Sequence, residues 1–296
     1  MKIAYLNLVH RDPQLLRRAI ETLSTPQCGF FVHVDKKSDI RAFATITGSN
    51  ITFCQPRIPV YWSEYTQIDA TLLMLRQALA SSTGYDYFVF LQGSVYPLRS
   101  GAYIQAFLEE NRHFEFMNLV RMPAPGYQLH KINKLYYPSS QPIRRLGAKL
   151  LRTLGLAKRD FRQHLGKLDP YAGHACWALS REACQHILAF VTSHPHVCAY
   201  FRHTWVPEES FFHTILGNSP FHPRIRKLPV YADWSKSIGL HPAMLNDEHV
   251  AFFQAHEKVW VEDEWGSSEM LFARKFSDER LDLVDRVDEM INRKQA

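Results

Sequence analysis

The sequence lacks the features of a secreted, membrane-spanning or disulfide-stabilised protein. It has five cysteines among 296 residues, an odd number, and no Cys-x-x-Cys pair. This pattern argues against a disulfide framework and a zinc ribbon, so we expect reduced thiols. No apolar run approaches the ~20 residues that a membrane span needs. The N-terminus has no signal-peptide h-region or small-residue cleavage site, so we expect a cytoplasmic chain.

The sequence also lacks a recognised metal motif, although it contains 15 histidines. Four of them, His194, His196, His203 and His213, lie close together along the chain. Their spacing matches no ligand pattern such as His-Glu-x-x-His. We therefore expect no zinc site.

Charge is the first feature that the sequence has in excess. Lys and Arg outnumber Asp and Glu by 35 to 29, which suits an anionic partner but also an ordinary soluble surface. The segment 143–167 holds eight Lys or Arg and a single acid, Asp160. Its leucines recur at helical spacing, which predicts a basic amphipathic helix that is either solvated or in contact with anionic lipid or an anionic acceptor. Aromatic residues are not interleaved there, so we expect no nucleic-acid partner.

Strand-like and helix-like segments alternate through the first hundred residues. Apolar runs at 2–9, 30–35, 51–55 and 87–92 predict strands, and helical patterns at 13–23 and 64–81 separate them. Asp12 and Pro13 have the residue types of an N-cap and a first-turn proline. This alternation predicts an α/β fold in which helices cover a mostly parallel, twisted central sheet.

Ligands of such sheets bind beyond the carboxyl ends of the strands. The residues at these ends are Val9 and His10, then Asp35 with Trp62 somewhat further on, and then Gln92, Gly93 and Ser94. We expect a binding site at this edge of the sheet.

Two adjacent acids, Glu208 and Glu209, stand among apolar residues in WVPEESFFHTILGNSPF. Pro207 suits the first helical position, which would put both acids in the first turn, where free N–H groups stabilise a carboxylate. The neighbouring aromatic residues would desolvate the carboxylate and raise its pKa. The pair could hold a basic carboxylate beside a pocket or could only cap a helix, and the pattern does not choose between the two acids.

Arg274 and Lys275 are embedded in the apolar stretch LFARKF. Cations in such surroundings pair with an internal carboxylate or bind a phosphate. Both interpretations stay open from the residues alone.

Seven stretches, taken together and in order, resemble the core-2/I-branching β-1,6-N-acetylglucosaminyltransferase family, which also contains peptide xylosyltransferases and many bacterial homologues. They are HVDKKSD, VYWSEYTQIDATL, YFVFLQGSVYPLRS, GHACWALSREA, VPEESFFHTILGNSPF, DWS followed by HP, and LFARKF. The resemblance spans about residues 2–278. It implies a GT-A fold in one domain over 1–296, with a nucleotide-binding half (1–100), an acceptor and catalytic half (101–278) and a C-terminal helix (279–296).

The resemblance also implies roles for single residues. Glu209 matches the catalytic base, and Lys275 matches the lysine that binds the diphosphate. Asp35 and Trp62 match positions at the uracil and nucleoside, and Val9, His10, Gly93 and Ser94 match donor-binding strand ends. His174, Trp177 and Glu208 fall in the acceptor region, although Trp177 could equally be a core residue. The second cation that binds the diphosphate could be Arg274, Lys236 or Lys258. Val95 stands at a position where the family has an acidic residue.

The family pattern implies an inverting transfer from a UDP-sugar to a hydroxyl of a glycan, without a metal. Gln92-Gly93-Ser94 stands where many nucleotide-sugar transferases have a metal-binding Asp-x-Asp. We expect UDP-N-acetylglucosamine as donor and a glycan acceptor, lipid-linked or free, in bacterial surface polysaccharide synthesis, with segment 143–167 at the inner membrane face. UDP-xylose, UDP-glucose and UDP-galactose are alternative donors, and a non-catalytic sugar- or nucleic-acid-binding protein is the alternative function.

Overall fold

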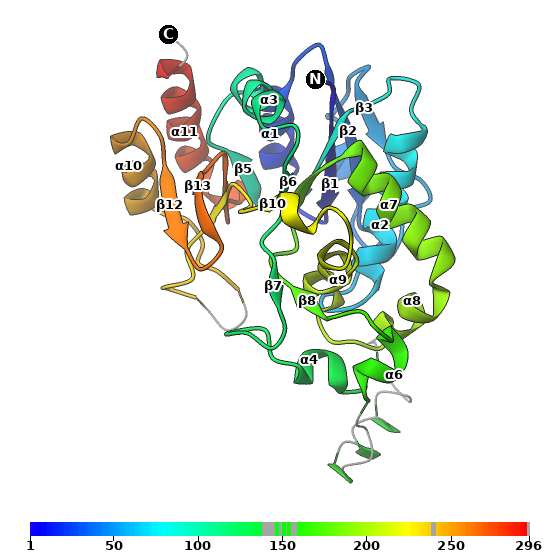
Figure 1. Cartoon of the computed structure of the whole chain (residues 1–296). Coiled ribbons are helices and arrows are strands. Elements are labelled where there is room, and N and C mark those ends of the chain that lie inside the picture. Colours follow the sequence, from blue (N-terminus) through cyan, green and yellow to red (C-terminus); the bar gives the residue numbers. More distant parts are fainter. Residues whose placement is uncertain (138–145, 148–149, 152, 155–158, 238–240, 295–296) are drawn as a thin grey trace.

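A seven-stranded mixed sheet forms the centre of the computed structural model, which describes residues 1–137, 146–147, 150–151, 153–154, 159–237 and 241–294 (Figure 1). The strand order is β10-β6-β9-β4-β1-β2-β3. Strands β4, β1, β2 and β3 are parallel, whereas β9 runs antiparallel to both β4 and β6. The strands are β1 (Ile3–Val9), β2 (Cys28–Val34), β3 (Ile51–Phe53), β4 (Tyr87–Gln92), β6 (Glu115–Phe116), β9 (Trp177–Ser180) and β10 (Ile225–Arg226).

Helices cover both faces of this sheet because its central strands are apolar on both sides. In β1, Ala4, Leu6 and Leu8 join one hydrophobic core, and Ile3, Tyr5 and Val9 join the other. The first core is completed by α2 (Thr66–Ala80) and α7 (Arg181–Ser193), the second by α1 (Pro13–Leu23) and α3 (Gly101–Glu110). The predicted α/β fold with a mostly parallel central sheet is thereby confirmed, and its layers agree with a GT-A-like arrangement.

A smaller sheet of order β11-β14-β5 lies beside the main one and carries the two candidate cations. Its strands are β5 (Val95–Pro97), β11 (Val230–Ala232) and β14 (Phe272–Arg274). Helices α10 (Asp247–Ala255) and α11 (Leu281–Arg293) pack against it around a third core. Helix α11 is the charged C-terminal helix that the sequence indicates.

A two-stranded hairpin stands next to this sheet (Figure 1). It consists of β12 (Trp260–Asp263) and β13 (Gly266–Glu269), which pair antiparallel with Asp263 opposite Gly266. Gly266 has φ 108°, a backbone conformation that glycine adopts without strain. The hairpin tip is therefore the dipeptide Glu264-Trp265.

The remaining short elements connect these layers. They are β7 (Val120–Arg121), α4 (His130–Asn133), α6 (Phe161–Leu165), β8 (Tyr171–Ala172), α8 (Pro195–Phe201), a 3-10 turn (Pro207–Glu209) and α9 (Phe211–Gly217), with 3-10 turns at Ile40–Phe43, His222–Arg224 and Asp278–Arg280.

The N-terminus of α1 is capped from the other end of the chain, which corrects the expected role of Asp12. Asp12 occupies the N-cap position, but its φ is 59° and its side chain makes no cap hydrogen bond to the helix. The carboxylate of Asp278 instead accepts hydrogen bonds from the N–H groups of Gln14 (3.1 Å) and Leu15 (2.7 Å). Asp12 Oδ1 in turn accepts from the backbone N–H of Asp278 at 3.1 Å. The segment after Lys275 is therefore bound to the turn that follows β1.

The basic segment 143–167 is only partly described. Arg144, Arg145, Lys149 and Arg152 lie outside the described residues. Four leucines of the segment are exposed, namely Leu146, Leu150, Leu151 and Leu154. At its C-terminal end, Phe161 and Leu165 of α6 are buried in the first core, so this end is part of the folded body. Within the described ranges, no helix is both long and apolar enough to cross a bilayer.

Candidate active site

A cavity of about 1240 Å³ opens at the carboxyl ends of β1, β2 and β4, which is the edge where the sequence predicts a binding site. Expected site residues from distant parts of the chain line it together. They are Val9, His10, Asp35, Trp62, Gly93, Ser94, His174, Glu208, Glu209, Arg274 and Lys275. The fold therefore brings the strand ends, the two acids and the two cations to a single space.

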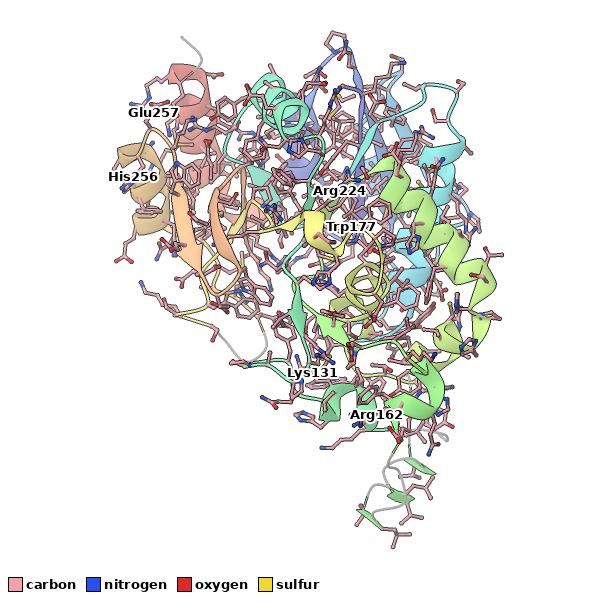
Figure 2. The ribbon with its side chains drawn as sticks, viewed as in Figure 1. Lys131, Arg162, Trp177, Arg224, His256 and Glu257 are labelled. Carbon is pink, nitrogen blue, oxygen red and sulfur yellow. The ribbon has the colours of Figure 1, made fainter. Side chains whose placement is uncertain are left out.

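Trp177 does not line this cavity, and its expected role in stacking on an acceptor sugar is wrong. Its side chain is fully buried, and its strand β9 lies between β4 and β6. Figure 2 shows Trp177 in the middle of the molecule. Its ring lies 5.4 Å from that of Phe90 and 5.9 Å from that of Phe212, measured between centroids. A strand with neighbours on both edges and helices on both faces offers no exposed side, so Trp177 is a core residue.

The two acids lie in a 3-10 turn instead of the first turn of a longer α-helix. The turn Pro207–Glu209 ends at Ser210, whose φ of −140° separates it from α9. The carbonyl oxygen of Glu209 accepts a hydrogen bond from the N–H of Gly173 at 2.9 Å. A Cβ atom at Gly173 would lie 1.7 Å from the carbonyl oxygen of Asn118, so only glycine allows this approach. The backbone thus holds Glu209 beside His174.

Glu209 directs a partly exposed carboxylate into the cavity. Its side chain is 29% exposed, and its Oε2 atom lies 3.2 Å from Nζ of Lys131, which belongs to α4. Burial raises the pKa of Glu209, whereas the charges of Lys131 and Arg274 lower it. The result is a carboxylate that is more basic than usual and is still paired with a cation, which suits a general base.

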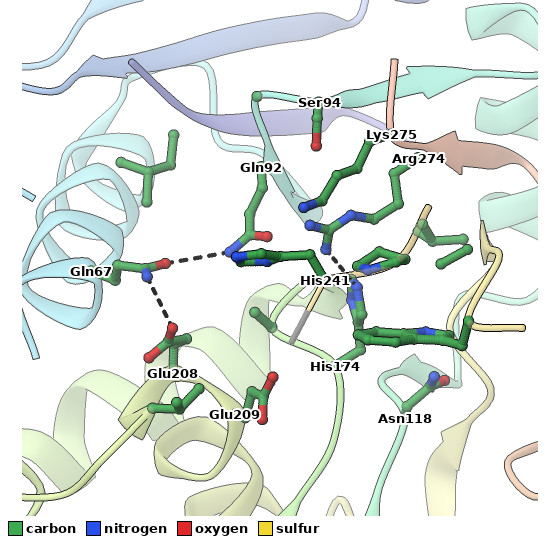
Figure 3. A pocket seen from close by; sticks show the side chains of 18 of the residues that line it. Gln67, Gln92, Ser94, Asn118, His174, Glu208, Glu209, His241, Arg274 and Lys275 are labelled. Carbon is green, nitrogen blue, oxygen red and sulfur yellow. Dashed lines mark hydrogen bonds between the residues drawn. The ribbon is translucent and has the colours of Figure 1, made fainter. Parts of the chain in front are cut away.

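Glu208 lies deeper and has different partners, so the structure distinguishes two acids that the pattern leaves equivalent. Its Oε1 accepts a hydrogen bond from Gln67 Nε2 at 2.9 Å, and Gln92 donates to Gln67 Oε1 at 3.3 Å (Figure 3). Burial, reinforced by the charge of Glu209, raises the pKa of Glu208 to about 8. Glu208 therefore carries a proton at neutral pH, whereas Glu209 has a cationic partner in Lys131 that favours its ionised form.

Arg274 and Lys275 form a positive wall across the cavity from the acids (Figure 3). Nη1 of Arg274 lies 2.7 Å from Nε2 of His174 and donates to it, which keeps that imidazole neutral. Burial and the Arg274 charge hold the pKa of His174 well below its usual value. Burial, Arg274 and Arg11 lower the pKa of Lys275 to about 8. An anion bound here would offset the repulsion between these cations.

The cations have no internal carboxylate partner in the part of the chain that the structure describes, so one of the two open interpretations of LFARKF loses its support. The other two candidates for a second cation lie elsewhere. Lys236 pairs with exposed Glu248 at 2.8 Å, and Lys258 is half-exposed beside Glu269; neither lines the cavity. Of the three alternatives, Arg274 is the one that lies beside Lys275.

Asp35 and Trp62 lie at the end of the cavity beyond β2. Burial opposes ionisation of Asp35, but hydrogen bonds from Lys37 Nζ (2.6 Å) and the N–H of Val60 (3.2 Å) outweigh it and keep the pKa of this carboxyl below its usual value. Trp62 is 51% exposed and contacts the edge of His241, with 5.6 Å between centroids. An ionised acid and an accessible indole therefore face the same end.

Several lining residues have no clear signal in the sequence. Gln67 lies on an ordinary amphipathic helix, Lys131 follows a proline-rich loop, and Lys227 and the hairpin tip belong to short, polar segments. Such residues reach the cavity only through tertiary packing, and periodicity does not indicate them. In the described ranges, no group of three or more His, Cys, Asp or Glu side chains could hold a metal ion.

Comparison with known proteins gives a family. Residues 3–255 match the profile of the family described as Core-2/I-Branching enzyme. The chain is 26% identical to Xylosyltransferase 2 of Homo sapiens over 229 residues, which cover 74% of this chain and 25% of that protein. It is 25% identical to Xylosyltransferase 1 of Rattus norvegicus over 229 residues, or 74% of this chain and 26% of that protein. The chain thus spans about a quarter of the length of these curated relatives, and the family match establishes that it belongs to the Core-2/I-Branching enzyme family.

Proposed function

We propose that this chain is a glycosyltransferase that moves a sugar from a UDP-sugar to a hydroxyl group of a glycan, with inversion and without a metal ion. The observation that supports this most is the opposition of Glu209 to Arg274 and Lys275 across one cavity (Figure 3). A transfer of this kind needs a base on the acceptor side and positive charge on the leaving-group side. Membership of the Core-2/I-Branching enzyme family and the similarity to xylosyltransferases support the same reaction class.

In the proposed reaction, the acceptor oxygen attacks the anomeric carbon as its proton passes to the carboxylate of Glu209. The bond from the anomeric carbon to the β-phosphate oxygen breaks, and its electron pair stays with UDP. One displacement at the opposite face of the carbon inverts the configuration. Lys275 and Arg274 stabilise the negative charge that develops on the leaving diphosphate.

The donor nucleoside would lie toward Asp35 and Trp62. An exposed indole can stack on a nucleobase, and an ionised carboxylate can accept a hydrogen bond from a base N–H or a ribose hydroxyl. Val9, His10, Gly93 and Ser94 would then contact the nucleotide along the strand ends, since all four line the cavity.

The proposal of a metal-free reaction is supported by the residues at the end of β4. Gln92, Gly93 and Ser94 carry no carboxylate there, whereas two cations face the same space. Cationic side chains can neutralise a diphosphate as a divalent ion does, although each carries one charge instead of two. Turnover in the presence of excess chelator tests this; loss of turnover with EDTA and recovery with Mn²⁺ would contradict it.

N-acetylglucosamine is the donor sugar that the family resemblance favours, and xylose is a second candidate because the similar curated proteins are named xylosyltransferases. Calorimetric titration of the full chain with UDP, UDP-N-acetylglucosamine and UDP-xylose, with chelator present, tests both. Absence of UDP binding would overturn the proposed function as a whole.

We further propose a cytoplasmic role in surface polysaccharide synthesis, with a lipid-linked acceptor. This rests on the basic composition of segment 143–167 and on the resemblance to bacterial family members. Co-sedimentation with liposomes containing anionic lipid tests it. Neutralising Arg144, Arg145, Lys149 and Arg152 together should weaken binding to the liposomes, and unchanged binding would contradict the membrane contact.

A further inference from the structure

The β12–β13 hairpin supplies one side of the cavity from outside the part of the chain that matches the family. The match ends at residue 255, and the hairpin begins at Trp260. Glu264 and Trp265 at its tip, and Asp263 at the end of β12, nevertheless line the cavity together with Glu209. The hairpin is therefore placed to affect what binds next to the candidate base.

A buried lysine of the main body holds the hairpin in this position. The side chain of Lys227 is 4% exposed, and its ammonium group lies 2.9 Å from Oδ1 of Asp263. The same group donates to the carbonyl oxygens of Val261 (2.9 Å) and Gly266 (3.3 Å). All three protons of the ammonium group thus have an acceptor on the hairpin, so the tip is attached to the body on both of its strands.

A continuous series of contacts leads from the hairpin tip to the candidate base. The ring of Trp265 packs edge-to-face on Tyr127, with 5.7 Å between centroids and 80° between planes. The ammonium group of Lys131 lies 4.9 Å from the centroid of Tyr127 and 3.2 Å from Glu209 Oε2. In a complex with a ligand beside Trp265 and Tyr127, only the side chain of Lys131 would therefore lie between Tyr127 and the carboxylate of Glu209, the proposed base.

The side chains at this end select a chemical class of ligand. Aromatic rings pack on the apolar C–H face of a pyranose, and carboxylates accept hydrogen bonds from its hydroxyl groups. Trp265 and Tyr127 provide the rings, and Glu264 provides an exposed carboxylate, whereas that of Asp263 is paired with Lys227. The charge of Glu264 opposes an anionic ligand, whereas the positive charge for the diphosphate is supplied by Arg274 and Lys275.

We propose that the hairpin tip and Tyr127 form an acceptor subsite for an uncharged sugar residue, adjacent to the sugar whose hydroxyl Glu209 deprotonates. This subsite rests on the proposed function and deepens it, because it assigns part of the acceptor specificity to residues 263–265. A peptide acceptor and an anionic glycan are the two outcomes that this chemistry disfavours.

The test compares two tryptophans of the same hairpin. Trp265 lines the cavity, whereas Trp260 is 58% exposed and does not line it. The full chain, saturated with UDP, is applied to an array of neutral, sialylated and sulfated oligosaccharides and serine-containing peptides. Affinity for each bound probe is then measured by calorimetry for the wild type, W265A and W260A. We expect W265A to weaken binding of neutral oligosaccharides about tenfold or more and W260A to change it less than twofold.

Charge reversal at the tip provides a second variant that does not remove packing. Glu264 is exposed, so E264K should leave the fold intact. We expect E264K to weaken binding of neutral oligosaccharides and to increase binding of sialylated or sulfated ones at least threefold. Unchanged probe binding in both W265A and E264K would overturn the subsite, as would binding of peptides or anionic glycans in preference to neutral ones.

The binding of UDP separates a failure of this inference from a failure of the proposed function. If UDP binds normally to the wild type but no neutral oligosaccharide on the array binds, the subsite is wrong and the transferase proposal stands. If UDP does not bind, the proposed function fails first. Both tip variants should bind UDP as the wild type does, because they keep Arg274 and Lys275, the proposed diphosphate cations.

Discussion

The ammonium group of Lys131 lies 3.2 Å from Oε2 of Glu209, and both residues line the same cavity as Arg274 and Lys275. This pair sets the basicity of the candidate base, because burial raises the pKa of Glu209 and Lys131 counteracts it. Removal of the lysine charge should therefore change the pH dependence of the reaction.

K131M should move the acidic limb of the kcat/KM profile to higher pH. Glu209 must be ionised to accept a proton, so activity falls as the pH falls through its pKa, and loss of the Lys131 charge raises that pKa. Transfer rates measured between pH 5 and 9 provide the check. K131R keeps the charge and is the control; an acidic limb that is identical in K131M and the wild type would contradict the pairing.

E209Q and E208Q should differ in activity, although the two residues are adjacent. E209Q removes the proposed base and should lower kcat by about 10²- to 10⁴-fold. Glu208 is protonated at neutral pH, so an uncharged glutamine replaces it with little electrostatic change, and we expect less than a tenfold loss. UDP affinity, measured by calorimetry, should be unchanged in E209Q. Equal losses of kcat in both variants would remove the distinction between the two acids.

The affinity for UDP should fall as the pH rises above about 8. Lys275 has a pKa lowered to about 8 in the free protein, and a bound diphosphate stabilises its protonated form, so binding near this pH takes up protons. Calorimetry in buffers of different ionisation enthalpy, between pH 7 and 9.5, measures this uptake. K275R keeps a permanent charge and should lose the pH dependence. An affinity that is constant over this range would contradict the role of Lys275.

Glu208 should make the folded protein less stable as the pH rises from about 4.5 to 8. Its pKa is raised from the ordinary 4.5 to about 8 by burial, so in this interval the unfolded chain binds fewer protons than the folded one. At pH 7 the free energy of unfolding is thereby lowered by roughly 3 kcal/mol, at 1.36 kcal/mol per pKa unit. Urea denaturation of the wild type and E208Q at pH 5 and pH 7.5 measures this; E208Q should show a smaller decrease.

D278A should lower both the stability and the UDP affinity. Loss of the hydrogen bonds to Gln14 and Leu15 removes the cap of α1, which costs about 0.5–2 kcal/mol. The same change weakens the attachment of the segment after Lys275 to the turn after β1, although the N–H of residue 278 still donates to Asp12. Thermal unfolding and UDP calorimetry measure the two effects. D282A, at an exposed residue that pairs with Arg280, is the control and should change neither by much.

The sequence predicts the central sheet, and the edge at which the cavity opens, because the apolar strands are long and continuous. Val9, Asp35 and Gln92 end such strands, and parallel strands bring their carboxyl ends together. Trp177 shows what the sequence pattern does not contain. The local pattern of an aromatic residue on a short strand is the same whether its side chain faces a ligand or the core. Its position between β4 and β6 is a property of the sheet order, which periodicity does not contain.

The two acids and the acceptor side show a second limit. A helical period applied to residues 207–215 assumes one continuous helix, but the break at Ser210 changes the directions of both glutamates. Lys131 and Trp265 come from short elements whose local patterns resemble ordinary loops. They reach Glu209 and Tyr127 only because packing of distant segments brings them there, so a local pattern cannot indicate them.

The hydrogen bonds that Asp278 makes to Asp12, Gln14 and Leu15 have a consequence for biosynthesis. A chain that emerges from the ribosome amino end first presents β1 and α1 long before Asp278 has been made. During that interval the first helix lacks its cap, and the cavity lacks Lys275. The cap of α1 therefore forms only after Asp278 has been made, and a chain that stops before Lys275 lacks one cation of the proposed diphosphate site.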